Sequence, residues 1–243
     1  CWDIKHWDKF EPLDPHRGGF GRQLESLKII KDAVGPDVPV IQTVYSPFHW
    51  ALRLTREFAR QYREDANTVD RGLSTITASL VAFIKACINE AGIDGFFLAI
   101  YGAQSIFFAE EEFTRWLLPH NKRVLAAMRE SPMVITHIHG LKQSYFDACK
   151  DLDCDALSWE DRTAGPSIAE ARKKSNKCFM GGVDHERALT ATTDEVYKES
   201  VDAIKQSGGY GLILAPGCTF DPATPVENVF AMKRAVFDCA PKK

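Results

Sequence analysis

The sequence lacks the motifs that would assign it to several common function classes. It contains no GxGxxG pattern, so no nucleotide cofactor is expected. Its seven cysteines are irregularly spaced and never arranged as CxxC, which favours reduced thiols in a cytoplasmic protein over a disulfide framework. No apolar run approaches the ~20 residues of a membrane-spanning helix, and no signal-peptide pattern opens the chain. We therefore expect no membrane association.

An excess of charge of one sign is also missing. The formal net charge of the 243 residues is −3, with 45% hydrophobic and 26% charged residues. This composition is typical of a globular protein, and the small net charge gives no reason to expect nucleic acid or an anionic membrane as a partner. The length suits one large domain, since barrels of ~250 residues fold as single domains.

What the sequence does have is a regular alternation of short apolar segments with helix-length segments. Residues 67–91 carry apolar side chains at three- and four-residue spacings, which predicts a helix. A second helix is expected over about residues 22–34, and a third begins with a capping box at Thr192 and Glu195. Near-continuous apolar strands between helices indicate a parallel sheet that is covered on both faces. The expected strands are residues 38–45, 95–101, 133–138, 156–159, 178–183 and 210–215.

The alternation predicts an α/β fold, and specifically a TIM-type (β/α)8 barrel with about six βα units in this chain. It would form a single domain over residues 1–243, with an irregular segment at residues 1–21. A closed barrel needs eight strands, so two units are expected to precede residue 1 or to be absent. The chain opens on Cys1 and not on Met, which agrees with processing or truncation. An open doubly wound sheet is the alternative.

In both architectures ligands bind at the carboxyl ends of the strands, and polar side chains gather there in this sequence. The candidates for proton transfer are Tyr101, Glu160 and Asp184. The candidates for substrate contact are Ser46, Gln104, Trp159, Arg162 and His185. Two of these also suit structural roles, since Asp184 is a preferred helix cap and Arg162 has acidic neighbours for a local ion pair.

The most specific pattern is His137-x-His139 at the end of one strand, with Cys218 after another. Side chains two apart on a strand point to the same face, within ~7 Å, so both imidazoles can bind one metal ion. A thiolate from a neighbouring strand end would be a third ligand, and three protein ligands with one open position are typical of catalytic zinc. In the alternative interpretation, the histidines form hydrogen bonds near a cleft and Cys218 is a packed thiol.

A further pattern consists of five segments that fall mostly at strand ends. They are residues 39–47 (PVIQTVYSP), 156–159 (ALSW), 181–184 (GGVD), 214–218 (LAPGC) and 224–228 (TPVEN). In order and spacing these segments, which extend over nearly the whole chain, resemble the uroporphyrinogen decarboxylase superfamily. The resemblance implies the barrel fold and leaves a choice between two branches.

The decarboxylase branch removes carboxyl groups from the acetate arms of a tetrapyrrole without metal or cofactor. Where those enzymes have Gly-His-Gly at the last strand end, this chain has Gly217-Cys218-Thr219. The other branch comprises zinc-dependent methyltransferases that move a methyl group from a methylated corrinoid to a thiol. Their motif, His-x-Cys with a distant Pro-Gly-Cys, resembles this chain at His137 and Cys218, with His139 in place of the first Cys. That imidazole makes the site less negative, so coenzyme M does not follow as the substrate.

Three hypotheses follow. The first is a metal-dependent methyltransferase or demethylase that activates a thiol or oxygen nucleophile at a His-His-Cys site holding zinc or another divalent transition metal. The second is a uroporphyrinogen decarboxylase, a lyase of porphyrin and haem biosynthesis, in which Arg53 or Arg162 holds carboxylates. The third is a non-catalytic protein that binds a porphyrin or a metal. The expected partners are a small molecule, either a methylated compound or a tetrapyrrole, and a second copy of the chain in a homodimer.

Overall fold

The computed structural model describes residues 3–239, so the thiol expected at Cys1 lies outside the described residues. The chain forms two compact units. Unit 1 comprises Cys1–Gly102, Phe107–Thr136 and Leu152–Cys154, and unit 2 comprises Ala103–Ile106, His137–Asp151 and Asp155–Lys243. That the whole chain forms a single barrel domain stays a prediction.

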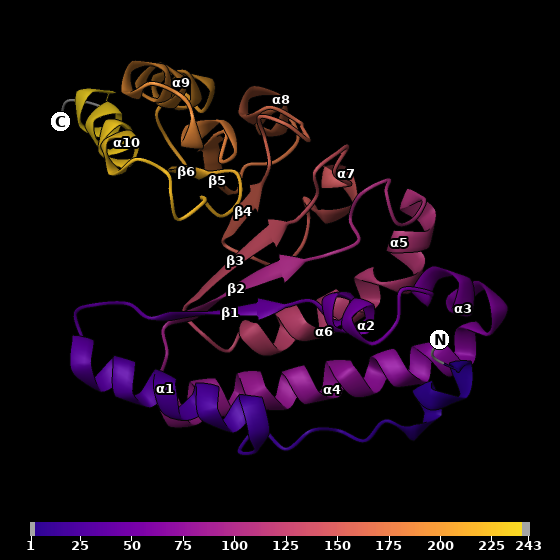
Figure 1. Cartoon of the computed structure of the whole chain (residues 1–243). Coiled ribbons are helices and arrows are strands. Elements are labelled where there is room, and N and C mark those ends of the chain that lie inside the picture. Colours follow the sequence, from indigo (N-terminus) through magenta and orange to yellow (C-terminus); the bar gives the residue numbers. More distant parts are fainter. Residues whose placement is uncertain (1–2, 240–243) are drawn as a thin grey trace. The chain divides into compact units, whose positions relative to one another are not determined.

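Helices and strands alternate along the chain (Figure 1). The strands are β1 (Ile41–Tyr45), β2 (Gly95–Ile100), β3 (Met133–Ile138), β4 (Ala156–Trp159), β5 (Cys178–Val183) and β6 (Leu212–Pro216). The α-helices are α1 (Gly18–Val34), α2 (Pro47–Leu54), α3 (Phe58–Glu64), α4 (Ala66–Ala91), α5 (Glu110–Trp116), α6 (Leu118–Met128), α7 (Phe146–Cys149), α8 (Ile168–Arg172), α9 (Thr193–Gln206) and α10 (Val226–Cys239). Two short 3-10 helices are η1 (Ile4–Lys9) and η2 (Arg187–Leu189).

The six strands found in residues 3–239 form one sheet in the order β1-β2-β3-β4-β5-β6. The pairs β1–β2, β4–β5 and β5–β6 are parallel, as expected for strands that are joined by helical crossovers. The predicted α/β fold with a parallel sheet is thereby confirmed. Since paired parallel strands run in one direction, their carboxyl ends lie at the same edge of the sheet, where ligands are expected.

The long helix α4 is the centre of unit 1. Its first turn is capped by the Asp65 carboxylate, which accepts a hydrogen bond from the Thr68 N–H at 3.1 Å. Gly92 ends it in a left-handed conformation with φ 60°. α1 runs alongside α4 (Figure 1), and η1, α2, α3 and α6 also pack against it. Its apolar side contributes several nearly inaccessible side chains, among them Val69, Leu73, Leu80, Phe83, Ile84 and Cys87.

α4 also corrects one sequence prediction. By length and composition it is apolar enough to cross a membrane, with a mean hydropathy of 1.4 over an 18-residue window, whereas no such segment is expected from the sequence. Half of that window is buried in the structure, and the core helix of a water-soluble protein meets the same criterion. The packing of α4 within unit 1 accounts for its apolar composition.

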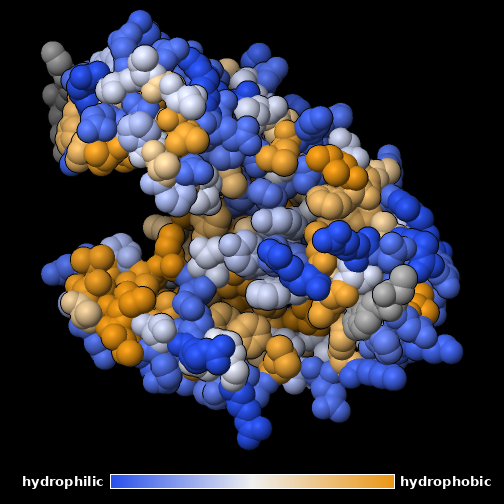
Figure 2. Space-filling view, viewed as in Figure 1, coloured by the Kyte–Doolittle hydropathy of each residue, from blue (hydrophilic) through white to orange (hydrophobic). Residues whose placement is uncertain are grey.

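α1 contributes to the unit 1 core with one side only. Leu24 and Leu27 are buried, whereas Ile29, Ile30 and Val34 are 69%, 45% and 39% exposed. Figure 2 shows hydrophobic side chains gathered on the surface over the C-terminal end of this helix. Exposed apolar surface of this kind is typical of a contact surface.

Unit 2 has a core of its own between β5, β6, α9 and α10. It includes Val183, Ala188, Val196, Ala231 and Met232, each at most 7% exposed. α9 begins at the predicted capping box: the Glu195 N–H donates to Thr192 Oγ1, and the Thr192 N–H and hydroxyl donate to the Glu195 carboxylate. Packing against β5 and α10, together with the capping box, fixes the position of α9.

The N-terminal segment differs from its prediction. Residues 1–21 are not wholly irregular, because η1 forms at Ile4–Lys9 and α1 already begins at Gly18. The Asp3 carboxylate accepts the Lys5 N–H at 2.9 Å and so caps η1.

Two strands begin later than predicted, and the cause in each case is local backbone chemistry. β1 starts at Ile41 because Pro39 has no N–H to donate and the Val40 N–H donates to the Asp94 carboxylate and not to a neighbouring strand. β6 starts at Leu212 because Gly211 adopts φ 60°, which is incompatible with an extended strand.

Candidate metal centre

The carboxyl end of β3 delivers two histidines to one side of the sheet. His137 lies on β3 and His139 follows the strand directly, whereas Ile138 between them is fully buried. Strand alternation places the two imidazoles on the same face, with their ring centroids 5.8 Å apart. The Ser158 hydroxyl on β4 lies 3.1 Å from His137 Nδ1, so Nε2 is the nitrogen through which His137 would bind a metal ion.

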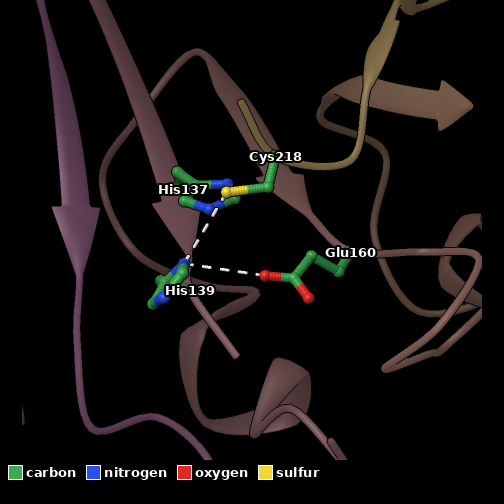
Figure 3. A group of neighbouring side chains, drawn as sticks. All are labelled: His137, His139, Glu160 and Cys218. Atoms are coloured by element: carbon green, nitrogen blue, oxygen red, sulfur yellow. Dashed lines mark hydrogen bonds and ion pairs between the residues drawn. The ribbon is translucent and has the colours of Figure 1, made fainter. Parts of the chain in front are cut away.

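Cys218 and Glu160 complete a group of four potential metal ligands (Figure 3). Cys218 follows β6 by two residues, and its Sγ is 3.8 Å from His139 Nδ1. Glu160 directly follows β4, and its Oε1 is 3.6 Å from the same nitrogen. One donor atom from each of the four side chains lies within 4.8 Å of all the others. We call His137, His139, Glu160 and Cys218 the donor cluster.

Gly217 explains how Cys218 comes so close to Glu160. Its N–H donates to the Val183 carbonyl at 2.8 Å, which ties the turn after β6 to the end of β5. A Cβ at this position would lie 3.1 Å from Glu160 Cα and 3.4 Å from the Trp159 carbonyl oxygen. The Pro-Gly-Cys sequence therefore permits a close approach of two backbones that a larger residue would push apart.

Burial dominates the electrostatics of the two histidines. It lowers the pKa of His137 to about 3, and the neighbouring His139 and His185 add to this effect. It also lowers the pKa of His139, again with a contribution from His185. Both imidazoles are therefore neutral near pH 7, which is the form that donates a lone pair to a metal.

Burial acts in the opposite direction on the two acids of the donor cluster. It raises the pKa of the Glu160 carboxyl to about 7; the Gly140 amide opposes this, and the carboxylates of Glu186 and Asp184 add to it. Burial likewise raises the pKa of the Cys218 thiol. A nearby divalent cation would reverse both effects, because it stabilises carboxylate and thiolate.

The donor cluster fits a divalent transition metal. Imidazole and thiolate are ligands that zinc prefers, and a carboxylate commonly joins them. Glu160 is 1% exposed, and neither of its oxygens makes a hydrogen bond of ordinary geometry to the described residues, which is costly for a buried carboxylate unless a cation is near. Tetrahedral zinc separates its ligand atoms by roughly 3.3–3.8 Å, so donor atoms that lie up to 4.8 Å apart would have to move together by about 1–1.5 Å to bind one ion.

Two predicted site residues, Ser46 and Tyr101, belong to unit 1. The buried Ser46 hydroxyl accepts the Tyr101 N–H at 3.0 Å and so joins the ends of β1 and β2. The Tyr101 ring packs edge-on against His49, with centroids 4.6 Å apart. Both residues thus have structural contacts within unit 1, and their roles towards a substrate stay predictions.

Gln104 and Trp159 lie in unit 2 and make structural contacts there. Gln104 Oε1 accepts the Leu141 N–H at 3.0 Å, which fixes the loop after β3. The Trp159 ring is 1% exposed and packs edge-on against Phe179, and its indole N–H donates to the Pro166 carbonyl at 2.7 Å. The structure therefore places the Trp159 side chain in the core of unit 2.

Asp184, which follows β5, caps the turn that leads into η2, whereas the N-cap residue of η2 itself is Glu186. The Asp184 carboxylate accepts the N–H groups of Glu186 and Arg187, each at 3.0 Å. His185 is half-buried and contributes, after burial, to the lowered pKa values of His137 and His139. A substrate contact through His185 stays a prediction.

Arg162 forms the local contacts that the sequence allowed as an alternative. Its guanidinium donates to the Gly182 carbonyl at 2.8 Å, to Asp202 Oδ2 at 2.7 Å and to the Glu199 carbonyl at 2.9 Å. All three side-chain nitrogens are engaged, which favours a structural role over direct binding of a substrate anion.

Sequence reasoning missed Ser158 and Gly217 and gave Glu160 a narrower role. Glu160 is predicted to transfer protons, and the structure adds it to the donors around His139. A signal for both Ser158 and Glu160 was present, since residues two apart at a strand end share a face. Gly217 gave no such signal, because its effect depends on which backbone lies opposite.

Comparison with known proteins identifies a family and several relatives of this chain. The family model described as "Uroporphyrinogen decarboxylase (URO-D)" matches residues 1–238. The chain is 25% identical over 215 residues to "Methylcobamide:CoM methyltransferase MtaA" of Methanosarcina barkeri, covering 87% of this chain and 62% of that protein. It is 23% identical over 233 residues to "Methylcobamide:CoM methyltransferase MtbA" of Methanosarcina acetivorans, covering 95% of this chain and 67% of that protein. The chain thus spans less than two thirds of the MtaA protein's length.

Solved structures show the same fold. A "methyltransferase from Methanosarcina mazei" superposes with a TM-score of 0.81 at 24% identity, covering 94% of this chain and 70% of that chain. A B12-independent methionine synthase from Shewanella gives a TM-score of 0.65 at 15% identity, covering 88% and 66%. Since the family model matches all but the last few residues of the chain, this protein belongs to the uroporphyrinogen decarboxylase (URO-D) family.

Proposed function

We propose that the chain belongs to a metal-dependent methyltransferase or demethylase of the URO-D family. The observation that carries the proposal is the donor cluster, in which three separate strand ends bring four donor atoms within 4.8 Å of one another. Three protein ligands with one position left for a substrate are typical of a catalytic zinc site, and His137, His139 and Cys218 can supply three at the carboxyl ends of parallel strands, with Glu160 beside them. The methyltransferase names of the two curated relatives support the reaction class.

His137, His139 and Cys218 would hold zinc or another divalent transition metal, and Glu160 is a fourth donor that must leave the metal when a nucleophile binds it. The metal would supply Lewis acidity that lowers the pKa of a thiol or oxygen nucleophile. Ser158 holds the His137 ring in orientation through the contact at Nδ1, as hydroxyl and carbonyl partners do for metal-binding histidines.

Glu160 is suited to move a proton at the same place. Burial raises the pKa of its carboxyl to about 7 when no metal is bound, and a bound cation would lower that pKa and so favour the carboxylate, the form that acts as a base. A carboxylate oxygen of Glu160 can accept the proton that a thiol or hydroxyl nucleophile loses. Proton transfer by Tyr101 and Asp184 and a substrate contact through His185 stay predictions.

The second histidine changes which methyl acceptor the site would use. With His139 in place of a cysteine, the three ligands that stay on the metal when Glu160 leaves it, His137, His139 and Cys218, carry one negative charge and not two. A less negative ligand set lowers the pKa of a bound nucleophile further and leaves it less electron-rich. The CoM in the relatives' names is therefore not transferred to this chain, and the proposed methyl donor is a methylated small molecule or a methylated corrinoid.

The first experiment is metal analysis of the chain purified without chelator, with the variants Cys218→Ala and Cys178→Ala. Cys178 is a half-buried free thiol of the same unit and lies outside the donor cluster, so it is the matched control. We expect about one equivalent of zinc or a similar metal in the wild type, retained in the Cys178 variant and lost from the Cys218 variant. Absence of stoichiometric metal from the wild type would end the proposal.

The second experiment follows methyl transfer from methylcobalamin to small thiols and alcohols. Metal-loaded wild type is expected to transfer the methyl group, and Cys218→Ala is not. Tetrapyrrole decarboxylation is less well supported, because the curated relatives are methyltransferases and Cys218 stands where decarboxylases have the central His of Gly-His-Gly. A cytoplasmic location and a homodimer remain predictions.

A further inference from the structure

Glu160 lies between two firmly anchored neighbours. On one side the Trp159 ring is buried, and its indole N–H donates to a backbone carbonyl at 2.7 Å. On the other side Asp161 is buried beside β5, where its Oδ1 accepts the Gly182 N–H at 2.9 Å. The Glu160 carboxylate makes no hydrogen bond of ordinary geometry to the described residues, its Oε1 lies 3.6 Å from Nδ1 of the neutral His139, and the Gly140 amide is its other polar neighbour. Its position therefore depends on how the backbone is held.

The anchor at Asp161 requires a glycine opposite. A Cβ at Gly181 would lie 2.7 Å from Asp161 Oδ1, which is closer than two such atoms can approach. The Gly181-Gly182 pair on β5 thus provides both the space for the Asp161 carboxylate and the N–H that it accepts. The Asp161 carboxylate therefore fits closely against β5 in the position where it accepts the Gly182 N–H.

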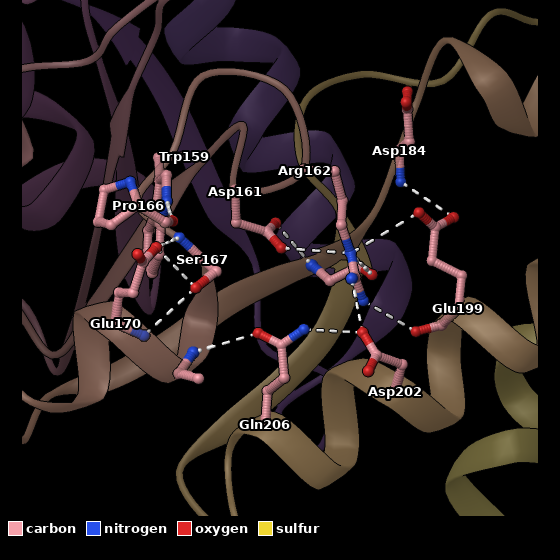
Figure 4. Close-up of polar contacts among 12 residues, drawn as sticks. Trp159, Asp161, Arg162, Pro166, Ser167, Glu170, Asp184, Glu199, Asp202 and Gln206 are labelled. Carbon is pink, nitrogen blue, oxygen red and sulfur yellow. Dashed lines mark hydrogen bonds and ion pairs between the residues drawn. The ribbon is translucent and has the colours of Figure 1, made fainter.

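Arg162 extends the anchor from β5 to α9 (Figure 4). Its Nε donates to the Gly182 carbonyl, Nη2 to the Glu199 carbonyl and Nη1 to the Asp202 carboxylate, all within 2.9 Å. Nε is also 3.6 Å from Asp161 Oδ2. Because the guanidinium is planar and binds two backbone carbonyls and a carboxylate, it fixes both the orientation and the distance of the loop after β4 relative to β5 and α9.

We propose that Asp161 and Arg162 are positioning residues for the metal site: they lock the loop after β4 onto β5 and α9 and thereby aim the Glu160 carboxylate at His139 and Cys218. This inference rests on the metal site proposed above. Glu160 has three side-chain torsions, and the Gly140 amide near its carboxylate forms no well-aligned hydrogen bond with it, so a shift of its backbone moves its oxygens out of the donor cluster. Residues that orient a metal ligand change metal affinity by about 10–100-fold when they are substituted.

The test measures zinc affinity by competition with a chromophoric chelator for Arg162→Lys and for a matched control, Arg172→Lys. Lysine keeps the charge but cannot reproduce the three-way fork. Arg172 also donates to two backbone carbonyls of unit 2, those of Lys177 at 2.8 Å and Gly211 at 3.0 Å, so its loss gives a similar structural defect away from Glu160. We expect about tenfold weaker zinc binding for Arg162→Lys and unchanged binding for Arg172→Lys.

A double-mutant cycle separates positioning from general loss of stability. If Arg162 acts through Glu160, the effect of Arg162→Lys on zinc affinity disappears in a Glu160→Gln background. Equal affinity of wild type and Arg162→Lys, or the same loss in both backgrounds, would overturn the inference and leave the metal site intact. Wild type that binds no zinc would overturn the metal site itself. Should Arg162→Lys not fold, Asp161→Ala removes the acceptor of the Gly182 N–H and must show the same dependence on Glu160.

Discussion

Among single residues, Glu160 shows most clearly that metal binding and stability make opposite demands. Its carboxyl is buried, makes no hydrogen bond of ordinary geometry to the described residues and has a pKa raised to about 7. A residue selected only for stability would not be ionisable at this position. The strain is relieved if a divalent cation balances the charge, as the proposed metal site requires.

Glu160→Gln should therefore stabilise the metal-free fold at high pH. The folded-state pKa, about 7, lies above the ordinary value of 4.5, so folding favours the protonated carboxyl and Glu160 lowers stability as the pH rises through that interval. In EDTA we expect the variant to exceed wild type by about 1–3 kcal/mol at pH 8 and by much less at pH 4.5, measured by urea unfolding.

The exposed Glu111 is the control for this prediction. Glu111→Gln should leave the free energy of unfolding nearly unchanged at both pH values. A gain from Glu160→Gln that is equal at pH 4.5 and pH 8 would contradict the account, because it would not arise from ionisation of the carboxyl.

Prediction of the site residues from sequence succeeded where a residue type and its spacing carry the chemistry. His137 and His139 share a strand face, and Cys218 stands in a Pro-Gly-Cys turn, so all three could be grouped before the fold was known. The pairing of Arg162 with α9 could not be predicted, because two of its three acceptors are backbone carbonyls, which every residue has, and the third, Asp202, is 40 residues away in the sequence.

Among the secondary-structure elements, the turn after β6 places Cys218 close to the end of β4. Gly217→Ala would introduce a Cβ 3.1 Å from Glu160 Cα, so the two backbones must separate by a few tenths of an ångström. We expect zinc affinity to fall about tenfold and stability to fall by about 1 kcal/mol, measured by chelator competition and urea unfolding.

Gly19 is the matched control for the turn. It has open space around an added Cβ and lies within α1, where alanine is favoured over glycine by about 1 kcal/mol. Gly19→Ala should therefore leave zinc affinity unchanged and stability equal or higher. Zinc affinity that is the same in wild type and Gly217→Ala would show that the close approach of the two turns is not needed for metal binding.

Loss of the capping box of α9 should lower stability without changing zinc affinity. Thr192→Ala removes the hydroxyl that accepts the Glu195 N–H, and loss of such a cap costs about 1 kcal/mol. Zinc affinity should stay as in wild type, since Arg162 contacts α9 at Glu199 and Asp202, beyond its first turn. A parallel loss of zinc affinity would mean that α9 transmits any loosening to the donor cluster.

Strands were easier to predict than their ends. β4 and β5 match their predicted residues because near-continuous apolar runs are bounded there by polar residues. β1 and β6 begin later than predicted, since Pro39 and the positive φ of Gly211 act through the backbone and not through hydropathy. The apolar face of α4 was likewise recognised, whereas its length and hydropathy overlap with those of a membrane span.

For the whole molecule, metal binding should appear as added stability. The donor cluster joins the ends of β3, β4 and β6, and a ligand that binds only the folded state stabilises it by about 2.7 kcal/mol at 100 times its Kd. Zinc should therefore raise the Tm of the wild type by several degrees, measured by scanning calorimetry. Cys218→Ala should show little or no rise, and an equal rise in both proteins would indicate adventitious surface binding.

The most direct test of the central claim is X-ray absorption at the zinc edge of the zinc-loaded chain. The account predicts one sulfur at about 2.3 Å and nitrogen or oxygen ligands at about 2.0–2.2 Å, with the sulfur contribution lost in Cys218→Ser. A zinc shell without sulfur in the wild type, or one that keeps its sulfur in Cys218→Ser, would contradict the assignment of the donor cluster as the metal site.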